Sequence, residues 1–411
     1  MKYLLLKNGY VVQNQELLQK DVLIGNNRII EIGTKVRVPL PDSQVIDVTD
    51  RYLLPGLIHY DSPFLKGDPN ESSSSAIYIA LSHGATFLLD TVKLKKEIDY
   101  RSVISYARDG NKPIITDYGF HLRAFTEKRA SINDLINIFI LEGITSYVIK
   151  WKDIEKLDDD NLDELFAAAA KYRLLIICES PSASSDDMET AAQLNKSDWE
   201  KYRKILSIIH EYKCTFLFLN ITLKEELNFL LSNSELNKFI YASVHLNCKE
   251  KNSAKFGFND LNELWQNRNI LLAPPYLKIP NSKSNHFIEN SKSSSFLSNI
   301  LCNNGELSQE AIVKVCEMYA ARPAQLLGIY PQKGILERGA DADIIVWDPS
   351  ESNILKLRGT NTSLLRKDIN AVIINGKMIN DEVYEIPSHL QGRYIYRNII
   401  LPVNSASQTG E

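Results

Sequence analysis

The sequence predicts an α/β protein whose main part is a (β/α)8 TIM-like barrel, with a composite β-sandwich formed from both chain ends. One observation is the alternation of apolar, strand-like runs with helical stretches between residues 53 and 273. A second is strand-rich sequence at both ends of the chain, outside that region. The third is length, because 411 residues suit one large barrel with a smaller domain.

The barrel prediction rests on about eight strand-then-helix units, which imply a parallel sheet. The expected strands are Leu53–Ile58, Ala85–Asp90, Pro113–Phe120, Thr145–Trp151, Leu174–Cys178, Thr215–Leu219, Phe239–His245 and Ile270–Ala273. The expected helices include Ser73–Leu81, Ile98–Asp109, Ile132–Leu141, Leu162–Tyr172, Trp199–Glu211, Lys224–Leu231 and Leu307–Leu327. Residues 279–295 are rich in Ser and Asn and are expected as a loop, so the sequence leaves open whether residues 279–306 complete the barrel.

Short strands with turns between them are predicted at both chain ends. They are Tyr3–Leu6, Tyr10–Val12, Val22–Ile24, Ile29–Ile32, Val45–Val48, Ile344–Trp347, Val372–Ile374 and Met378–Ile379. Asn375-Gly376 predicts a hairpin turn. We therefore expect residues 1–53 and 335–400 to form the composite β-sandwich, residues 54–334 the barrel, and residues 401–411 a polar tail.

The composition excludes several classes of protein. A net charge of −4 indicates neither a nucleic-acid binder nor a membrane-surface binder. The apolar run at the start is too short for a signal peptide, and no long apolar stretch predicts a membrane span. The five cysteines are scattered without a C-x-x-C pair, which is typical of a reducing cytoplasm. We expect a cytoplasmic protein, and the absence of a Gly-rich phosphate loop predicts no cofactor-binding site.

Four regions of the chain carry recognisable motifs. They are Val45–Asp47 with Tyr52–Ile58, Gly84–Asp90, Asp117–His121, and Arg322–Gly328 with Lys333-Gly334 and Gly339–Asp348. These motifs resemble the cyclic amidohydrolases, the group of dihydroorotases, dihydropyrimidinases and hydantoinases. The resemblance is dense at residues 1–152 and 310–376 and thin at 180–305. It implies a homo-oligomer, often a dimer or tetramer, in which two divalent metals activate a water and an Asp on the last strand is the general base.

The resemblance also implies where the metal ligands should stand, at the carboxyl ends of the barrel strands. The first two His positions hold Asp61 and Pro63, while His59 takes the motif's Asp position. The carboxylated Lys position holds Val148, the fifth-strand His position holds Ile177, and the sixth-strand position holds Leu219 or Asn220. Residues 279–306 contain no Asp for the general base. We therefore expect no catalytic metal.

Five polar residues remain as candidates for catalysis, namely His59, Asp61, His121, Lys150 and Glu179. His59 and Asp61 share a strand face and could hold one metal with His121 or Glu179. Lys150 has the strand parity of Val148 and could replace the carboxylated lysine. A structural interpretation competes in each case, because a strand-end histidine is usually hydrogen-bonded and a strand-end lysine usually pairs with an acid or reaches solvent. Cys178 could be a nucleophile, but a buried, inert thiol is the commoner state.

Two functions follow. The favoured hypothesis is a protein that has lost metal-dependent hydrolysis and serves as a non-catalytic assembly or binding protein, as a homo-oligomer or with a protein partner. Collapsin response mediator proteins, and the inactive dihydroorotase-like subunits that associate with aspartate transcarbamoylase, provide analogies at the level of fold. The alternative is a divergent hydrolase of a cyclic amide C–N bond with a one-metal or metal-free site. A divalent metal such as zinc is expected only under this alternative.

Overall fold

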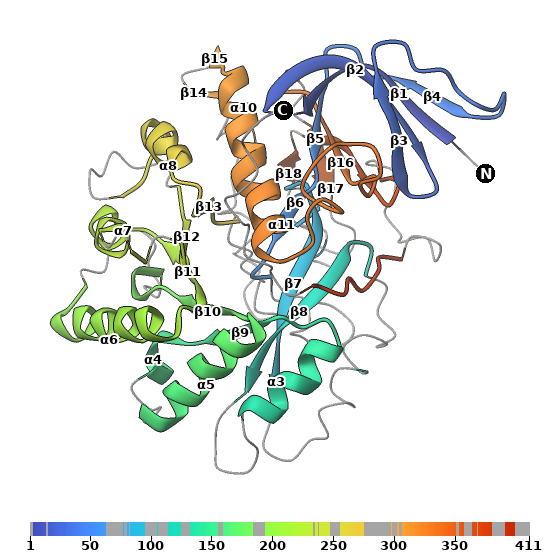
Figure 1. The fold of residues 1–411 in the computed structure, drawn as a ribbon. Helices are drawn as coiled ribbons and strands as arrows, with labels where there is room; N and C mark the ends of the chain where they lie inside the picture. The colour runs from blue at the N-terminus through green and yellow to red at the C-terminus, as the bar shows by residue number, and fades with distance from the viewer. Residues whose placement is uncertain are drawn as a thin grey trace, which may run out of the picture.

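The computed structural model describes residues 3–62, 83–94, 114–124, 132–183, 194–246, 255–274, 302–379 and 391–398, except for residues 14, 155–158, 233–234, 237, 304–305, 351–352, 357–363 and 368. It also describes single positions at residues 77, 80, 81, 105 and 297. Two large sheets dominate this part of the chain, one built from the chain ends and one from the middle (Figure 1).

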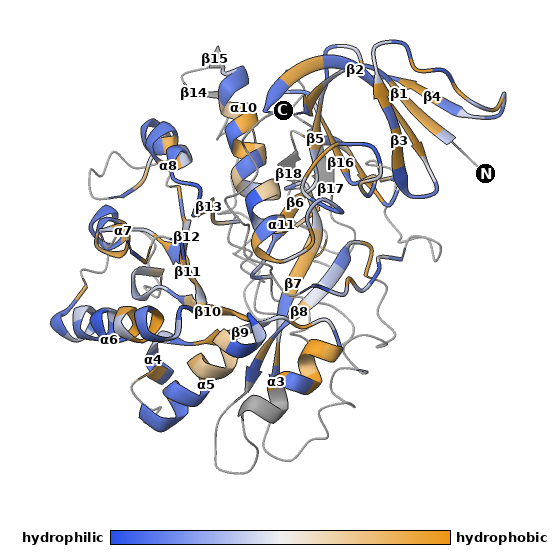
Figure 2. Ribbon diagram, in the orientation of Figure 1, coloured by the Kyte–Doolittle hydropathy of each residue, from blue (hydrophilic) through white to orange (hydrophobic). Residues whose placement is uncertain are grey.

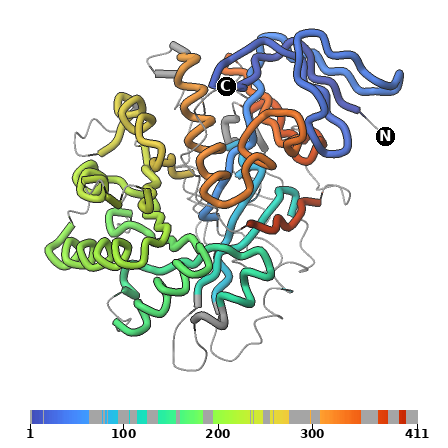
Figure 3. The backbone as a smooth tube through the Cα atoms, in the orientation of Figure 1, coloured from blue at the N-terminus to red at the C-terminus, as the bar shows by residue number. Residues whose placement is uncertain are grey.

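The first sheet combines both ends of the chain in the order β20-β19-β16-β5-β1-β2-β3, with β4 paired to β1. Its strands are β1 (Tyr3–Gln13), β2 (Glu16–Gly25), β3 (Arg28–Gly33), β4 (Gln44–Asp47), β5 (Tyr52–Pro55), β16 (Ile344–Trp347), β19 (Ile369–Ile374) and β20 (Lys377–Ile379). The two halves join where β5 pairs with β16, so the predicted composite β module is confirmed (Figure 3). Asn375 and Gly376 have φ angles of 51° and 72°, as a type I′ hairpin turn requires.

The second sheet is parallel throughout, in the order β13-β12-β11-β10-β9-β8-β7-β6. Its strands are β6 (Leu57–His59), β7 (Ala85–Leu94), β8 (Asp117–Ala124), β9 (Ser146–Ile149), β10 (Leu175–Glu179), β11 (Thr215–Ile221), β12 (Ile240–Val244) and β13 (Ile270–Leu272). Helices α3 (Ile132–Leu141), α4 (Trp151–Ile154), α5 (Asp159–Tyr172), α6 (Lys196–Tyr212), α7 (Lys224–Leu231) and α8 (Leu261–Gln266) follow the strands and cover the outer face (Figure 1). The sheet confirms the predicted barrel class.

The predicted strand Leu53–Ile58 is divided between the two sheets at Gly56, and the prediction of one continuous strand was wrong. The Gly56 N–H donates to the carbonyl oxygen of Asp343 at 2.9 Å. A Cβ atom on Gly56 would lie 2.1 Å from Thr86 Oγ1. Only glycine permits this approach, so the chain can leave β5 and enter β6 within one residue.

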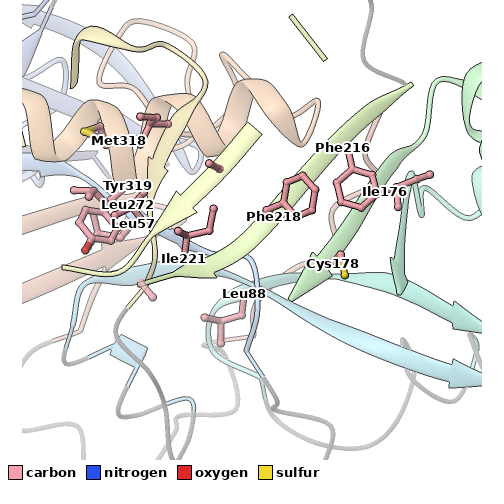
Figure 4. Packing of buried hydrophobic residues seen from close by; sticks show 14 of the residues in the cluster. Leu57, Leu88, Ile176, Cys178, Phe216, Phe218, Ile221, Leu272, Met318 and Tyr319 are labelled. Atoms are coloured by element: carbon pink, nitrogen blue, oxygen red, sulfur yellow. The ribbon is translucent and has the colours of Figure 1, made fainter. Parts of the chain in front are cut away.

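Alternate side chains of each barrel strand enter two different apolar cores. On β10, Ile176 and Cys178 pack against the helices, whereas Leu175 and Ile177 point into the barrel. Figure 4 shows the helix-facing core, where Ile176 and Cys178 lie near Phe216 and Phe218 of β11. The barrel interior is filled mainly by Ile58, Tyr60, Phe87, Leu89, Leu175, Ile177, Leu217, Leu219, Leu271, Ala324, Leu326, Leu327, Ile329 and Ile395.

The helices place apolar residues toward the sheet and polar residues toward solvent, as the mixed colouring of α6 and α10 indicates (Figure 2). α6 begins with a capping box between Asn195 and Asp198. Within the described residues, no helix has the length and apolar character needed to cross a membrane.

The return from the barrel was predicted as one helix over Leu307–Leu327 but consists of three parts. They are α10 (Gln309–Cys316), a π-helical turn at Glu317–Ala321 and α11 (Arg322–Leu326). Pro323 has no N–H to donate, so the helical hydrogen-bond ladder is interrupted in this region. Two hairpins were not predicted, β14 (Cys302–Asn303) with β15 (Glu306–Leu307) and β17 (Asn353–Lys356) with β18 (Leu364–Lys367).

Residues 391–398 form an extended segment that enters the barrel wall beside β8. β8 and β9 share a single paired position, Leu122 with Tyr147, which lies near the carboxyl end of β8. Below it, the Tyr118 N–H donates to the carbonyl oxygen of Arg393 at 2.9 Å, and the Tyr118 carbonyl accepts from the Ile395 N–H at 2.8 Å. Residues 391–398 therefore pair with the amino-terminal half of β8, where β9 does not pair with it.

The side chain of Tyr60 joins the two ends of the parallel sheet. β6 and β13, the first and last strands, show no backbone pairing with one another in the described residues. The Tyr60 hydroxyl oxygen lies 2.8 Å from the carbonyl oxygen of Leu272 and 2.9 Å from Ser243 Oγ. A carbonyl oxygen only accepts, so Tyr60 donates to Leu272 and accepts from the Ser243 hydroxyl. Burial raises the pKa of Tyr60 above its usual range, which keeps this donor protonated.

Replacing Tyr60 with phenylalanine removes both bridging hydrogen bonds and leaves the Leu272 carbonyl without this partner inside the protein. We expect Tyr60→Phe to lower the free energy of unfolding by about 1–3 kcal/mol, measured by urea denaturation. Tyr241→Phe is the matched control, because Tyr241 is half-buried beside the same core and its hydroxyl has no hydrogen-bond partner among the described residues. It should change the value by less than about 0.5 kcal/mol. Equal losses in the two variants would contradict the bridging role.

Candidate functional site

Polar side chains collect at the carboxyl ends of the barrel strands, on the face that points inward. Glu179 ends β10 and continues the inward row of Leu175 and Ile177. On β8, Phe120 and Leu122 pack toward the helices, so the alternate residues His121 and Arg123 point inward. Lys150 follows β9 on the inner face by the same alternation. These side chains stand where parallel barrels place their functional residues.

The positions at which the amidohydrolase resemblance places metal ligands are aliphatic and packed. Ile177 and Leu219 are buried members of the interior core, and Val148 is half-buried against it. Ile177 lies directly between Val148 on β9 and Leu217 on β11. None of these side chains has a nitrogen, oxygen or sulfur donor, so the residues present do not fit a two-metal centre. Pro63 lies outside the described residues.

Asn220, the other residue weighed for the sixth-strand ligand, serves the backbone of the barrel wall. It has a left-handed backbone, with φ of 59°, at an irregularity in the pairing of β11 with β12. Its N–H lies 3.4 Å from Ser243 Oγ, the hydroxyl that also contacts Tyr60. Its amide side chain is not a usual ligand for a transition metal.

The eighth strand of the parallel sheet is β13, which ends at Leu272 and agrees with the expected strand Ile270–Ala273. Residues 279–306, which contain no Asp, follow it in the chain, and most of them lie outside the described residues. The two residues directly after β13, Ala273 and Pro274, are both buried. Neither side chain can accept a proton from water, so these two described residues offer no general base.

His59 lies on the side of the barrel wall that faces the helices. Its neighbours Ile58 and Tyr60 both point into the barrel, so alternation directs His59 outward. The ring is fully buried, and neither ring nitrogen has a hydrogen-bond partner in the described part of the chain. Burial, and secondly the nearby His83, lower the pKa of His59 to about 3. Asp61, two residues later, is exposed, so the two candidates differ sharply in environment.

His121 lies inside the barrel wall with both ring nitrogens engaged. Its Nδ1 is 2.5 Å from Ser146 Oγ, and its Nε2 is 2.8 Å from the carbonyl oxygen of Tyr60. Burial, and secondly the charge of Arg397, lower the pKa of His121 to about 3, so the ring is neutral at ordinary pH. His121 and His59 therefore face opposite sides of the wall, and the structure does not bring them together.

The structure does bring Lys150 and Glu179 together at the mouth of the barrel. Ile149 on β9 is in register with Cys178 on β10, so the residues that follow them, Lys150 and Glu179, are neighbours. Both are half-buried.

Sequence reasoning missed the ion pair beside them, in which Arg123 Nη2 lies 2.6 Å from Asp153 Oδ2. The sequence indicated that Arg123 points inward, because it lies two residues after His121 on the same strand, and such residues share one face. Cys178 belongs to the helix-facing core instead, and burial raises the pKa of its thiol well above the usual range.

A second polar cluster lies at the opposite end of the barrel. Oxygen atoms of Asp117, Asp341 and Asp343 lie within 4.8 Å of one another, a spacing that could suit a cation. The Lys333 ammonium already occupies this position, with Nζ 2.7 Å from Asp117, 2.5 Å from Asp343 and 3.2 Å from Asp341. Arg393 adds a second cation, 2.7 Å from Asp117 and 2.6 Å from Asp341. The cluster is an ion network that links β8, residues 333–343 and residues 391–398.

The network controls the acidity of its members. Burial alone would raise the pKa of Asp117, but the charges of Lys333 and Arg393 outweigh it and hold that pKa at about 2. For Asp343, burial prevails over Lys333 and the pKa is raised. The sequence motifs include Asp117, Lys333, Asp341 and Asp343 but do not predict their contact, because it joins chain segments more than 200 residues apart.

Comparison with known proteins agrees with this architecture. The model of the amidohydrolase family matches residues 228–379. The D-hydantoinase of Geobacillus stearothermophilus is 22% identical over 410 residues, covering 85% of each chain. Dihydropyrimidinase-related protein 5 of Rattus norvegicus is 19% identical over 419 residues, covering 86% of this chain and 72% of the relative. The crystal structure of dihydropyrimidinase from Brevibacillus agri superposes with a TM-score of 0.72 at 18% identity, covering 97% of this chain and 99% of that one.

The barrel, the composite β module and the family match over residues 228–379 make this chain similar to the amidohydrolases. Within that class, the similarities in sequence and fold support the cyclic amidohydrolase group of hydantoinases and dihydropyrimidinases. The inferred resemblance is thus confirmed at the level of the group.

Lys333→Met tests how much the ion network contributes to the free energy of unfolding. The substitution keeps the length of the side chain but leaves three buried carboxylates with one cation fewer. We expect the free energy of unfolding to fall by about 3–5 kcal/mol, measured by urea denaturation. Lys171→Met on the exposed face of α5 is the control and should change it by less than about 0.5 kcal/mol. A small effect at Lys333, similar to that of the control, would show that the network does not hold the fold together.

The depressed pKa of Asp117 predicts a specific loss of stability in acid. A carboxyl whose pKa is about 2 when folded, against 3.8 ordinarily, stabilises the fold fully above pH 3.8 and loses that contribution as the pH falls through 2. We expect the wild type to lose about 2 kcal/mol more than Asp117→Asn across this window, measured by urea unfolding at each pH. The raised pKa of Asp343 acts with the opposite sign in both proteins, which is why the two are compared. Parallel curves would contradict the prediction.

Proposed function

We propose that this chain has lost metal-dependent hydrolysis and serves as a non-catalytic assembly or binding protein on an amidohydrolase scaffold. The single observation that carries the proposal is the aliphatic interior of the barrel. Val148, Ile177 and Leu219 occupy the expected ligand positions, and they pack as core residues. A hydrolytic metal needs several donor atoms converging on one point, and a packed hydrocarbon core provides none.

Packing strengthens the proposal beyond the loss of donors. Ile177 and Leu219 touch the same interior cluster as Leu89, Leu217 and Leu271. Aliphatic side chains that interdigitate in this way exclude the water that hydrolysis consumes. The scaffold would then act through its surface, as a homo-oligomer or with a protein partner, in the cytoplasm that the cysteine usage predicts.

The alternative is a divergent hydrolase of a cyclic amide, and one specific observation favours it. The barrel mouth still holds Arg123, Lys150, Asp153 and Glu179, which mix cations and carboxylates above the apolar interior. Relatives named D-hydantoinase carry an enzyme's name, so the group's chemistry is available to the scaffold. Under this alternative a single divalent metal such as zinc, or no metal, would act near Lys150 and Glu179.

Metal content and ring opening together decide between the two functions. Purified protein should contain only substoichiometric zinc, manganese and iron by elemental analysis, because Val148, Ile177 and Leu219 offer no donor at the expected ligand positions. It should not open dihydrouracil, hydantoin, dihydroorotate or allantoin, with the Geobacillus D-hydantoinase as the positive control. Stoichiometric metal would overturn the proposal if ring opening were lost in Glu179→Gln and retained in Glu200→Gln. Glu200 suits this control because it lies on an exposed part of α6.

The assembly half of the proposal needs its own measurement. Size-exclusion chromatography with light scattering gives the mass of the purified chain in solution, and we expect a dimer or tetramer. A strict monomer that also retains no protein from its native lysate would contradict an assembly role even if no metal were found.

A further inference from the structure

Arg397 belongs to the extended segment of residues 391–398, and its cationic side chain lies in the barrel wall. Its backbone N–H donates to the carbonyl oxygen of Gly143 at 3.2 Å. Ile395, two residues earlier, packs in the interior core, and an extended chain directs residues two apart to the same side. Arg397 is 4% exposed, so its guanidinium lies inside the protein.

The hydrogen-bond partners of this guanidinium are neutral. Nη2 donates to the carbonyl oxygen of Phe120 and to Ser146 Oγ, the latter at 2.9 Å. Because a carbonyl only accepts, His121 Nε2 must carry the hydrogen that reaches Tyr60, and its Nδ1 accepts from the Ser146 hydroxyl. The histidine and the serine therefore complete each other's hydrogen bonds without contributing a negative charge.

Two nitrogens of the guanidinium, Nε and Nη1, have no acceptor among the residues that the structure describes. No carboxylate in this part of the chain forms an ion pair with Arg397. Other buried cations are treated differently, since Lys333, Arg322 and Arg123 each pair with at least one carboxylate. A buried charge normally requires a partner of opposite sign, and buried donors normally require acceptors. Arg397 departs from both rules.

We propose that Arg397 binds a small monovalent anion, of the size and charge of chloride, through one of its two unpartnered nitrogens, Nε or Nη1. One negative charge neutralises the one uncompensated cation, whereas phosphate would bring excess charge. A small ion is required because the donors are closed from solvent and lie beside an apolar core. The N–H bonds of Nε and Nη1 point to different edges of the guanidinium, so a single ion accepts from one of them, and a halide can do so without any orientation of its own. This site is independent of whether the barrel catalyses a reaction.

Crystals of the full chain grown with bromide in place of chloride provide a direct test. Anomalous diffraction at the bromine edge should show a peak within hydrogen-bonding distance of Arg397 Nε or Nη1. Bromide found only at exposed lysines, with an ordered water or nothing beside Arg397, would overturn the proposal.

Thermal unfolding provides a second, independent test. At constant ionic strength, replacing gluconate with chloride should raise the wild-type melting temperature by about 2 °C or more, because only the folded chain offers the site. This difference should vanish in Arg397→Met. Arg393→Met is the matched control from the same segment, since Arg393 already has carboxylate partners. It should melt lower in both salts and keep the chloride effect.

Equal melting of the wild type in both salts, or a chloride effect that persists in Arg397→Met, would overturn the proposal. Should Arg397→Met fail to fold, the bromide measurement on the wild-type chain decides alone.

Discussion

The pairing of Lys333 with three buried aspartates is the interaction on which the architecture depends. Asp117 belongs to barrel strand β8, whereas Asp341 and Asp343 lie in the stretch that leads into β16 of the first sheet. Arg393 brings in the segment of residues 391–398. Because Lys333 and the three aspartates are shielded from water, each of these charges needs the others, and none can be lost alone without leaving its partners uncompensated in an apolar environment. The barrel, the β module and the closing segment are therefore held in one fixed arrangement.

The same need for compensation explains the interior of the barrel. An enzyme of this architecture would carry imidazoles and carboxylates inward and let a metal neutralise them. Here the inner rows are aliphatic at Val148, Ile177 and Leu219, and such side chains need no compensating ion. Cohesion between hydrocarbon side chains stabilises the packing of the strands at these positions. At the mouth, Lys150 and Glu179 are half-buried.

The sequence predicted local structure well and long-range contacts poorly. α3 and α7 have the predicted bounds, because apolar residues at helical spacing mark both helices along their whole length. The division of a strand at Gly56 was missed, since it depends on Thr86 approaching from another strand. The family motif identified Ile177 and Leu219 as the residues at two expected ligand positions, and both lie in the barrel interior. The last strand, predicted over Ile270–Ala273, agrees with β13, although that strand is only three residues long.

The position of residues 391–398 has a consequence for biosynthesis. Tyr118 obtains its second strand neighbour from a segment 276 residues further along the chain. While the ribosome is still making the intervening sequence, the amino-terminal half of β8 has an open edge, and an open edge can pair with another nascent chain. Completion of the wall must wait until this stretch has left the exit tunnel.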